Sequence, residues 1–185
     1  MNVEIIHDLK KEQDWVAVNG DYDQFHVYGD NEDYVGDTIG LMQKAAVKCF
    51  KYPFYVHFEG YDDQIDSVLL HQDVLDIYYQ TSGRSVLTMS GGKTYHAAIP
   101  SFTVKIPNYE SLKNVFNHWF HYAQENNMWL ITQGFRLDYI NKFAALETNN
   151  EPIVLVADHD AQSFSFIASH PSYRKKESLQ LIFED

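Results

Sequence analysis

Short runs of alternating apolar and polar residues dominate the chain and predict β-strands, because successive strand side chains point to opposite faces of a sheet. Such runs cover residues 25–28 and 54–59, and further short strands are predicted over 3–9, 15–18, 128–131 and 178–185. The turn formers Asn19, Gly20, Asp21 and Asp23 predict that runs 15–18 and 25–28 form a hairpin. Residues 152–168 predict a second hairpin, which turns at Asp158 to Ser163.

Two longer segments show the 3.6-residue period of amphipathic helices. The first is predicted over 30–51, with Asp30 as its N-cap. The second is predicted from Asn108, as N-cap, to about Asn126. Its predicted core face is Leu112, Val115, Phe116, Trp119, Phe120 and Ala123. A third, shorter helix is predicted over 135–147.

Residues 65–106 lack a helical period and are interrupted by turn signals at Ser82-Gly83, Gly91-Gly92 and Pro100-Ser101. This pattern predicts an antiparallel meander of four or five strands. The whole pattern predicts an α+β fold, in which an antiparallel β-sheet of short strands and hairpins is covered by two long amphipathic helices and a third short one.

The length of 185 residues predicts a single domain spanning residues 1–185. Segments 25–60 and 102–135 share an order of strand, helix and strand, which is compatible with a weak internal duplication. Chance similarity explains this order better, because amphipathic helices between strands are common.

The net charge of −12 is concentrated in the first half of the chain. Two windows, 12–37 and 59–76, contain fourteen acidic residues and neither lysine nor arginine. Such a field repels phosphate backbones and attracts basic surfaces, so direct nucleic-acid binding is not expected. A purely solubilising charge is the simpler explanation, but it does not require two windows free of basic residues.

Tyrosines lie within and beside these acidic windows, and tyrosine is enriched at protein interfaces. Acids interleaved with tyrosines predict a surface for a basic protein partner. The candidate partner-binding residues are Asp21, Asp23, Tyr28, Asp30, Glu32, Asp33, Tyr34, Asp37, Tyr61, Asp62, Asp63 and Asp66.

Nine histidines allow a second hypothesis, a metal-dependent hydrolase. His118 and His121 are spaced i, i+3 on the second predicted helix, although its core stripe places them on the outer side. The candidate metal ligands are His118, His121, Asp158, His159 and Asp160. Scattered surface histidines explain the same count.

The stretch Ser90-Gly91-Gly92-Lys93-Thr94 resembles the end of a phosphate-binding loop, but Leu87 occupies the place of its first glycine. Alternating residues and Pro100 follow instead of a helix, so a hairpin turn is predicted. The single cysteine, Cys49, excludes an intramolecular disulfide, and the absence of a signal-like or long apolar segment predicts a cytoplasmic protein.

These observations favour a non-enzymatic binding protein whose acidic, tyrosine-rich N-terminal half docks on a basic partner, such as a nucleic-acid-binding protein, and inhibits it by charge mimicry. No cofactor is expected. The alternatives are the metal-dependent hydrolase and a structural or assembly component without a ligand.

Overall fold

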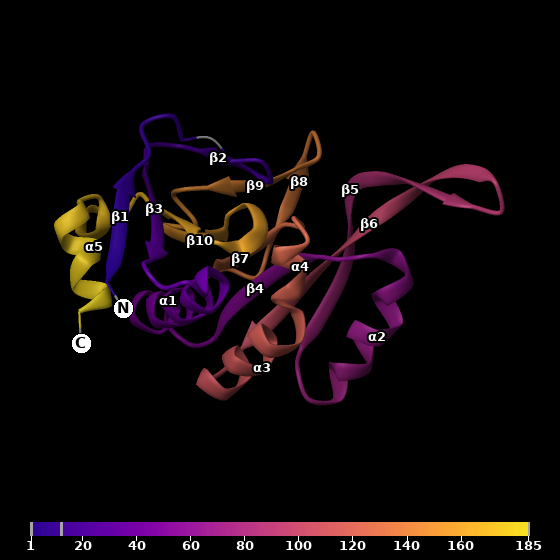
Figure 1. Ribbon diagram of the computed structural model, residues 1–185, viewed down its shortest axis with the longest axis horizontal. Helices are drawn as coiled ribbons and strands as arrows, with labels where there is room; N and C mark the ends of the chain where they lie inside the picture. Colours follow the sequence, from indigo (N-terminus) through magenta and orange to yellow (C-terminus); the bar gives the residue numbers. More distant parts are fainter. Residues whose placement is uncertain (1, 12, 185) are drawn as a thin grey trace.

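An eight-stranded antiparallel sheet forms the centre of the molecule in the computed structural model, which describes residues 2–11 and 13–184. Its strand order is β1-β3-β11-β10-β7-β4-β6-β5, and every neighbouring pair is antiparallel (Figure 1). The strands are β1 (Val3–His7), β3 (Asp23–Gly29), β11 (Phe164–Ala168), β10 (Ile153–Ala157), β7 (Trp129–Thr132), β4 (Phe54–Glu59), β6 (Lys93–Ile106) and β5 (Ile77–Ser90).

A second, three-stranded sheet consists of β2 (Val16–Asn19), β9 (Phe143–Glu147) and β8 (Asp138–Ile140). The predicted hairpin of 15–18 with 25–28 is wrong, because β2 pairs in parallel with β9 and not with β3. The predicted helix over 135–147 is also wrong. Asn141 and Lys142 both have positive φ, and this two-residue turn folds the segment into the β8–β9 hairpin.

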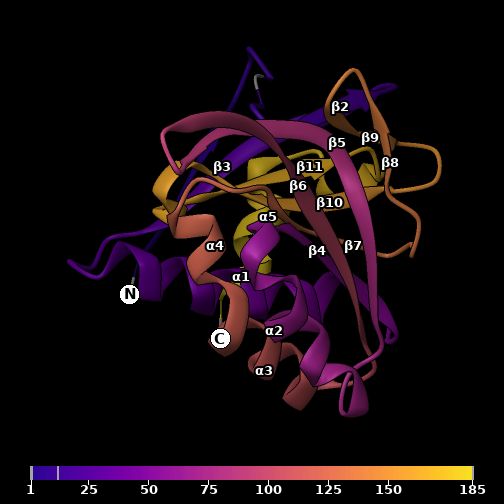
Figure 2. The same cartoon turned by 90° about the vertical axis from the view of Figure 1, so that its right-hand side faces the viewer.

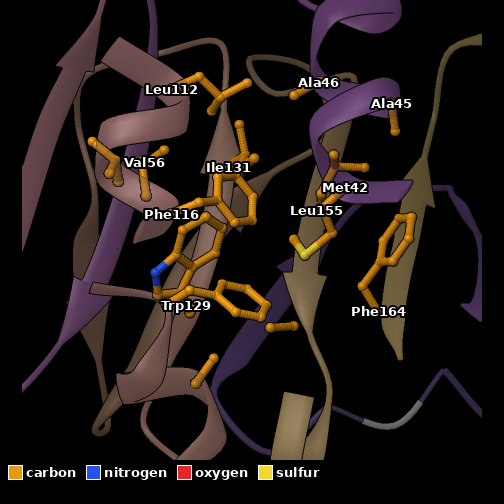
Figure 3. Close-up of a cluster of buried hydrophobic side chains, with 14 of the residues drawn as sticks. Met42, Ala45, Ala46, Val56, Leu112, Phe116, Trp129, Ile131, Leu155 and Phe164 are labelled. Atoms are coloured by element: carbon orange, nitrogen blue, oxygen red, sulfur yellow. The ribbon is translucent and has the colours of Figure 1, made fainter. Parts of the chain in front are cut away.

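The helices pack on one face of the large sheet, and their core contains the inward residues of alternate strand positions. These helices are α1 (Tyr34–Cys49), α3 (Tyr109–Trp119), α4 (His121–Gln124) and α5 (Lys176–Phe183). Figure 3 shows Phe116 of α3 beside Trp129, with ring centroids 4.6 Å apart, and Met42 of α1 near Leu155. The small sheet covers the other face, where Leu130, Val154 and Ile167 join a separate buried cluster.

The predicted helix from Asn108 to about Asn126 is divided at Phe120 into α3 and α4, and its predicted core face is confirmed, because all six apolar residues are buried. Its N-cap is also confirmed, since the Asn108 side chain accepts a hydrogen bond from the Ser111 N–H at 2.9 Å. In α1 the cap is Asp33, which accepts from the Gly36 N–H, and not the predicted Asp30. Asp30 instead accepts from the Asn2 backbone N–H at 2.8 Å.

The predicted meander over 65–106 is wrong. The segment begins with α2 (Ile65–Leu69) and continues as only two strands, β5 and β6, each of 14 residues. Gly91-Gly92 is a reversal, as predicted. At Ser82-Gly83 the register shifts within one strand, and Pro100 lies inside β6.

Residues 84–98 of this hairpin form an arm that projects from the body (Figures 1 and 2). The last pair between β6 and β4 is Ser101 with Glu59, so the strands of the arm pair only with each other.

The chain ends in a helix, so the predicted strand over 178–185 is wrong. Leu179, Ile182 and Phe183 lie on the buried side of α5, and their i, i+3, i+4 spacing is helical. The fold is therefore α+β, as predicted, with five helices among the described residues, of which only α1 reaches 16 residues. None of the helices in the described ranges is long and apolar enough to cross a membrane.

The two segments of the proposed duplication both fold into a strand, a helix and a strand. Their places in the sheet differ, because β11, β10 and β7 separate β3 from β4, whereas only β4 separates β6 from β7.

Candidate functional site

Four connecting segments at one end of the large sheet carry a group of exposed acids. β3 and β4 run in the same direction, because four antiparallel steps connect them, so the segments that follow them lie at the same end. The segment before β7 and the β10–β11 connection lie there too. We call residues 30–37, 59–66, 121–128 and 157–163 the acidic end.

The acidic end contains eleven Asp and Glu residues and neither lysine nor arginine. Eight of these acids are exposed: Asp30, Glu32, Asp33, Asp62, Asp63, Asp66, Glu125 and Asp160. Side-chain contacts connect the segments. Asn126 donates to Asp160 at 2.9 Å, and the Tyr122 hydroxyl donates to Gln64. The single-turn helix at His159–Ala161 packs against both α1 and α4.

Two of the predicted partner-binding residues lie elsewhere. Asp23 begins β3, and Asp21 precedes it, so both are at the opposite end of that strand from Asp30. Arg174 binds both: its Nη1 is 2.7 Å from Asp21, and its Nε donates to Asp23. The hydrogen bond from Arg174 lowers the pKa of Asp21, and Arg174 itself has a raised pKa. The structure therefore separates Asp21 and Asp23 from the other acids.

The remaining predicted residues occupy three different environments. Asp37 is buried and accepts hydrogen bonds from the Asn31 backbone and side chain, at 3.0 and 2.7 Å, so it shapes the start of α1. Tyr34 is half exposed at the first turn of α1, and Tyr61 packs its ring against Tyr122. Tyr28 lies on β3 opposite Glu4 of β1. Glu12, part of the acidic window, lies outside the described residues.

The structure does not assemble the metal site of the alternative hypothesis. His118 is exposed and its Nδ1 lies 2.7 Å from the Asn114 carbonyl of its own helix, and His121 is exposed on α4. His159 contacts Asn126 and Asp14 rather than either of them. Among the residues that the structure describes, no three His, Cys, Asp or Glu side chains are grouped to hold a metal ion.

Sequence reasoning missed a polar network on the face of the sheet that the helices leave open. The two ring nitrogens of His26 lie between two carboxylates, with Nδ1 3.1 Å from Asp158 and Nε2 3.2 Å from Asp8. The hydrogen bond to Asp158 raises the pKa of His26 above its ordinary value. The alternation of Phe25 and Val27 with His26 and Tyr28 along β3 is the signal that marks its polar face.

This network contains the residue types of a Ser-His-Asp triad, but the ring nitrogen that lies near the serine also faces a second carboxylate, that of Asp158. Ser165 Oγ donates to Asp158 at 2.8 Å and also lies 3.3 Å from Nδ1 of His26, while both imidazole nitrogens face carboxylates, which raise the pKa of His26. A general base for a serine needs a free ring nitrogen directed at the hydroxyl. The network therefore joins β1, β3, β10 and β11 beside an open pocket of about 320 Å³ that Trp15 and His159 also line.

A buried ion pair fixes the base of the arm to the acidic end. Glu59, at the end of β4, has no exposed surface, and its carboxylate binds the guanidinium of Arg84 from β5. Arg84 also lies over the Trp15 ring, 5.8 Å from its centroid. Glu59 is therefore neutralised within the molecule and does not add to the exposed charge.

Comparison with known proteins gives no relative: no protein-family model, no curated protein and no solved structure matches this chain.

Proposed function

We propose that this chain is a non-enzymatic binding protein that docks through its acidic end on the basic surface of a nucleic-acid-binding protein. Its carboxylates take the place of nucleic-acid phosphates, so the bound partner is inhibited. The observation that carries the proposal is the convergence of eight exposed carboxylates from four segments that contain neither lysine nor arginine. Such a surface focuses a negative field toward a basic partner.

The spacing of these charges supports phosphate mimicry. Four strand spacings of about 4.8 Å place the ends of β3 and β4 about 19 Å apart. Eight carboxylates over that length correspond to about one charge per 2.4 Å, whereas duplex DNA carries about one per 1.7 Å of its axis. The acidic end therefore offers a charge density of the same order as a nucleic acid.

The rigidity of the frame also supports the proposal. Most of the carboxylates are held in or beside short helical segments: Asp33 caps α1, Asp62 and Asp63 lie in one helical turn, and Asp66 lies in α2. Little conformational entropy is therefore lost when a partner binds. Tyr34 and Tyr61 place aromatic rings among them, and rings of this kind anchor many protein interfaces. Asp21 and Asp23, which Arg174 already neutralises, are not part of the proposed surface.

The test uses three purified chains as bait for a lysate of the host: wild type, an acidic-end variant and a matched control. The acidic-end variant is Glu32→Gln, Asp63→Asn, Glu125→Gln, which takes one exposed acid from each of three segments. The control, Asp73→Asn, Glu110→Gln, Glu177→Gln, removes the same charge from exposed positions outside the acidic end. Bound proteins are eluted with a salt gradient and identified.

We expect wild type and control to retain the same nucleic-acid-binding protein and release it at moderate salt, and the acidic-end variant to bind it at least about tenfold more weakly. The purified partner should then lose its nucleic acid when wild-type chain is added. Equal retention by the acidic-end variant and the control, or a partner that keeps its nucleic acid, would overturn the proposal.

A further inference from the structure

The arm is exposed to an extent that is unusual for a folded hairpin. Every residue from 85 to 96 is exposed, and the apolar side chains of Leu87 and Met89 are 68% and 75% exposed. Isolated two-stranded ribbons are marginally stable in water, and unpaired strand edges invite a partner. Arg84 fixes the base of the arm through Glu59, so the exposed part is held in a defined direction.

The arm also differs from the rest of the molecule in charge. Residues 77–109 contain no acidic residue, although the whole chain has a net charge of −12. Of their three basic residues, Arg84 binds Glu59 and Lys105 binds Asp76, so Lys93 carries the positive charge of the exposed part of the arm. In the ribbon, Leu87 pairs with His96, and Met89 pairs with Thr94, so one face of the arm is apolar and uncharged apart from a histidine. Lys93 is at the tip. The arm is therefore complementary to an acidic surface with accessible apolar groups.

The register of the sheet places the arm beside the acidic end. Because β6 pairs with β4 only as far as Ser101 and Glu59, residues 93–100 continue past the end of β4, where segment 59–66 begins. At about 3.3 Å per residue, they extend about 23 Å. This reach is comparable with the width of about 19 Å that separates the ends of β3 and β4.

We infer that two copies of this chain associate about a twofold axis, with the arm of each copy lying on the acidic end of the other. One molecule presents, at the same end, an acid-free arm with Lys93 at its tip and an acidic surface, so a single twofold rotation satisfies both contacts at once. Tyr34, half exposed among the carboxylates, gives Leu87 and Met89 an apolar contact. In the dimer the arm covers the surface proposed above for the basic partner, so the two associations exclude each other.

The association is tested on the purified chain by sedimentation velocity at several concentrations, in 50 and 500 mM NaCl. Wild type should form dimers whose dissociation constant rises about tenfold or more at the higher salt, because the contact pairs opposite charges. The arm variant is Leu87→Asp, Lys93→Glu. Its matched control is Leu181→Asp, Lys142→Glu, the same exchanges at an exposed leucine and lysine outside the arm.

The arm variant and the acidic-end variant should each be monomeric at concentrations at which wild type and the matched control are dimers. Mixing the two variants should restore a weaker association, because each supplies the surface that the other lacks. Circular dichroism checks that both remain folded. This experiment contains no foreign protein, so its outcome is independent of whether a basic partner is captured.

Three outcomes would overturn the inference. Wild type that stays monomeric at both salt concentrations has no such contact. A dimer that survives in the acidic-end variant but not in the arm variant joins arm to arm. A mixture of the two variants that fails to associate excludes the reciprocal contact of arm and acidic end.

Discussion

The Nε of Arg84 donates to the buried Oε1 of Glu59 at 3.2 Å, and this pair joins the base of the arm to the end of β4. Replacing Arg84 with Met leaves the Glu59 carboxylate buried without a partner, so we expect a loss of about 3–5 kcal/mol in the free energy of unfolding. The double variant Arg84→Met, Glu59→Gln should recover part of that loss. Urea denaturation measures both, and a single variant as stable as wild type would contradict the assigned pair.

Acid should destabilise the protein through His57, which lies inside the sheet between the hydroxyls of Thr103 and Thr132, 2.8 Å from each. Burial lowers the pKa of His57 to about 3. Between about pH 6.5, the ordinary pKa, and pH 3 the unfolded chain binds a proton that the folded chain excludes. Stability is therefore lost as the pH falls, by up to about 1.4 kcal/mol per pH unit.

The variant His57→Phe isolates this effect. It should be less stable than wild type by about 1–3 kcal/mol at pH 7, because it leaves a buried hydroxyl unpaired, but it cannot take up the proton. The difference in the free energy of unfolding between wild type and variant should shrink on acidification. A difference that stays constant between pH 7 and pH 4 would show that His57 is not held neutral.

His26 should titrate in the opposite sense. The hydrogen bond to Asp158 raises its pKa in the folded state, so the stability it contributes is fully present below the ordinary pKa and is lost as the pH rises through the raised value. Nuclear magnetic resonance of the imidazole nitrogens measures the midpoint directly. Asp158→Asn should lower that midpoint, whereas Asp138→Asn, at a distant exposed carboxylate, should leave it unchanged.

Two neighbouring aspartates should differ in their effect on α1. Asp33→Ala removes the hydrogen bond to the Gly36 N–H and should cost about 1 kcal/mol in stability. Asp30→Ala removes contacts to Asn2 at an exposed site and should cost less than about 0.5 kcal/mol. Thermal denaturation of the two variants compares them, and an equal or larger effect at Asp30 would contradict Asp33 as the cap.

Local signals in the sequence were sufficient where an element is determined by its own residues. Asn108 and the apolar period from Leu112 to Ala123 specify the helical segment after β6, and the alternation in 54–59 specifies β4. The local signals failed where contacts between distant parts of the chain determine the secondary structure or the strand pairing. Residues 176–183 form a helix because Leu179, Ile182 and Phe183 are buried where α5 packs against β1 and α1. Similarly, β2 pairs with β9 across more than 120 residues of chain.

The candidate site was predictable only in part, because local signals identify the acidic segments but not the tertiary contacts that bring them together. The absence of lysine and arginine drew attention to Asp30, Glu32, Asp33 and the acids of 62–66. It could not show that Arg174, far along the chain, returns to neutralise Asp21 and Asp23. Nor could it add Glu125 and Asp160, which reach the same end only because β7 and β10 lie between β3 and β4.

That interleaving of strands has a consequence for the integrity of the chain. β4 of the first half lies between β6 and β7 of the second, and β11 of the second half lies beside β3 of the first. A protease that cuts the exposed turn at Gly91-Gly92 would therefore produce two fragments, neither of which contains a continuous sheet. The two fragments of the nicked protein should remain associated under native conditions. Once separated, the two peptides should fold only after they associate again.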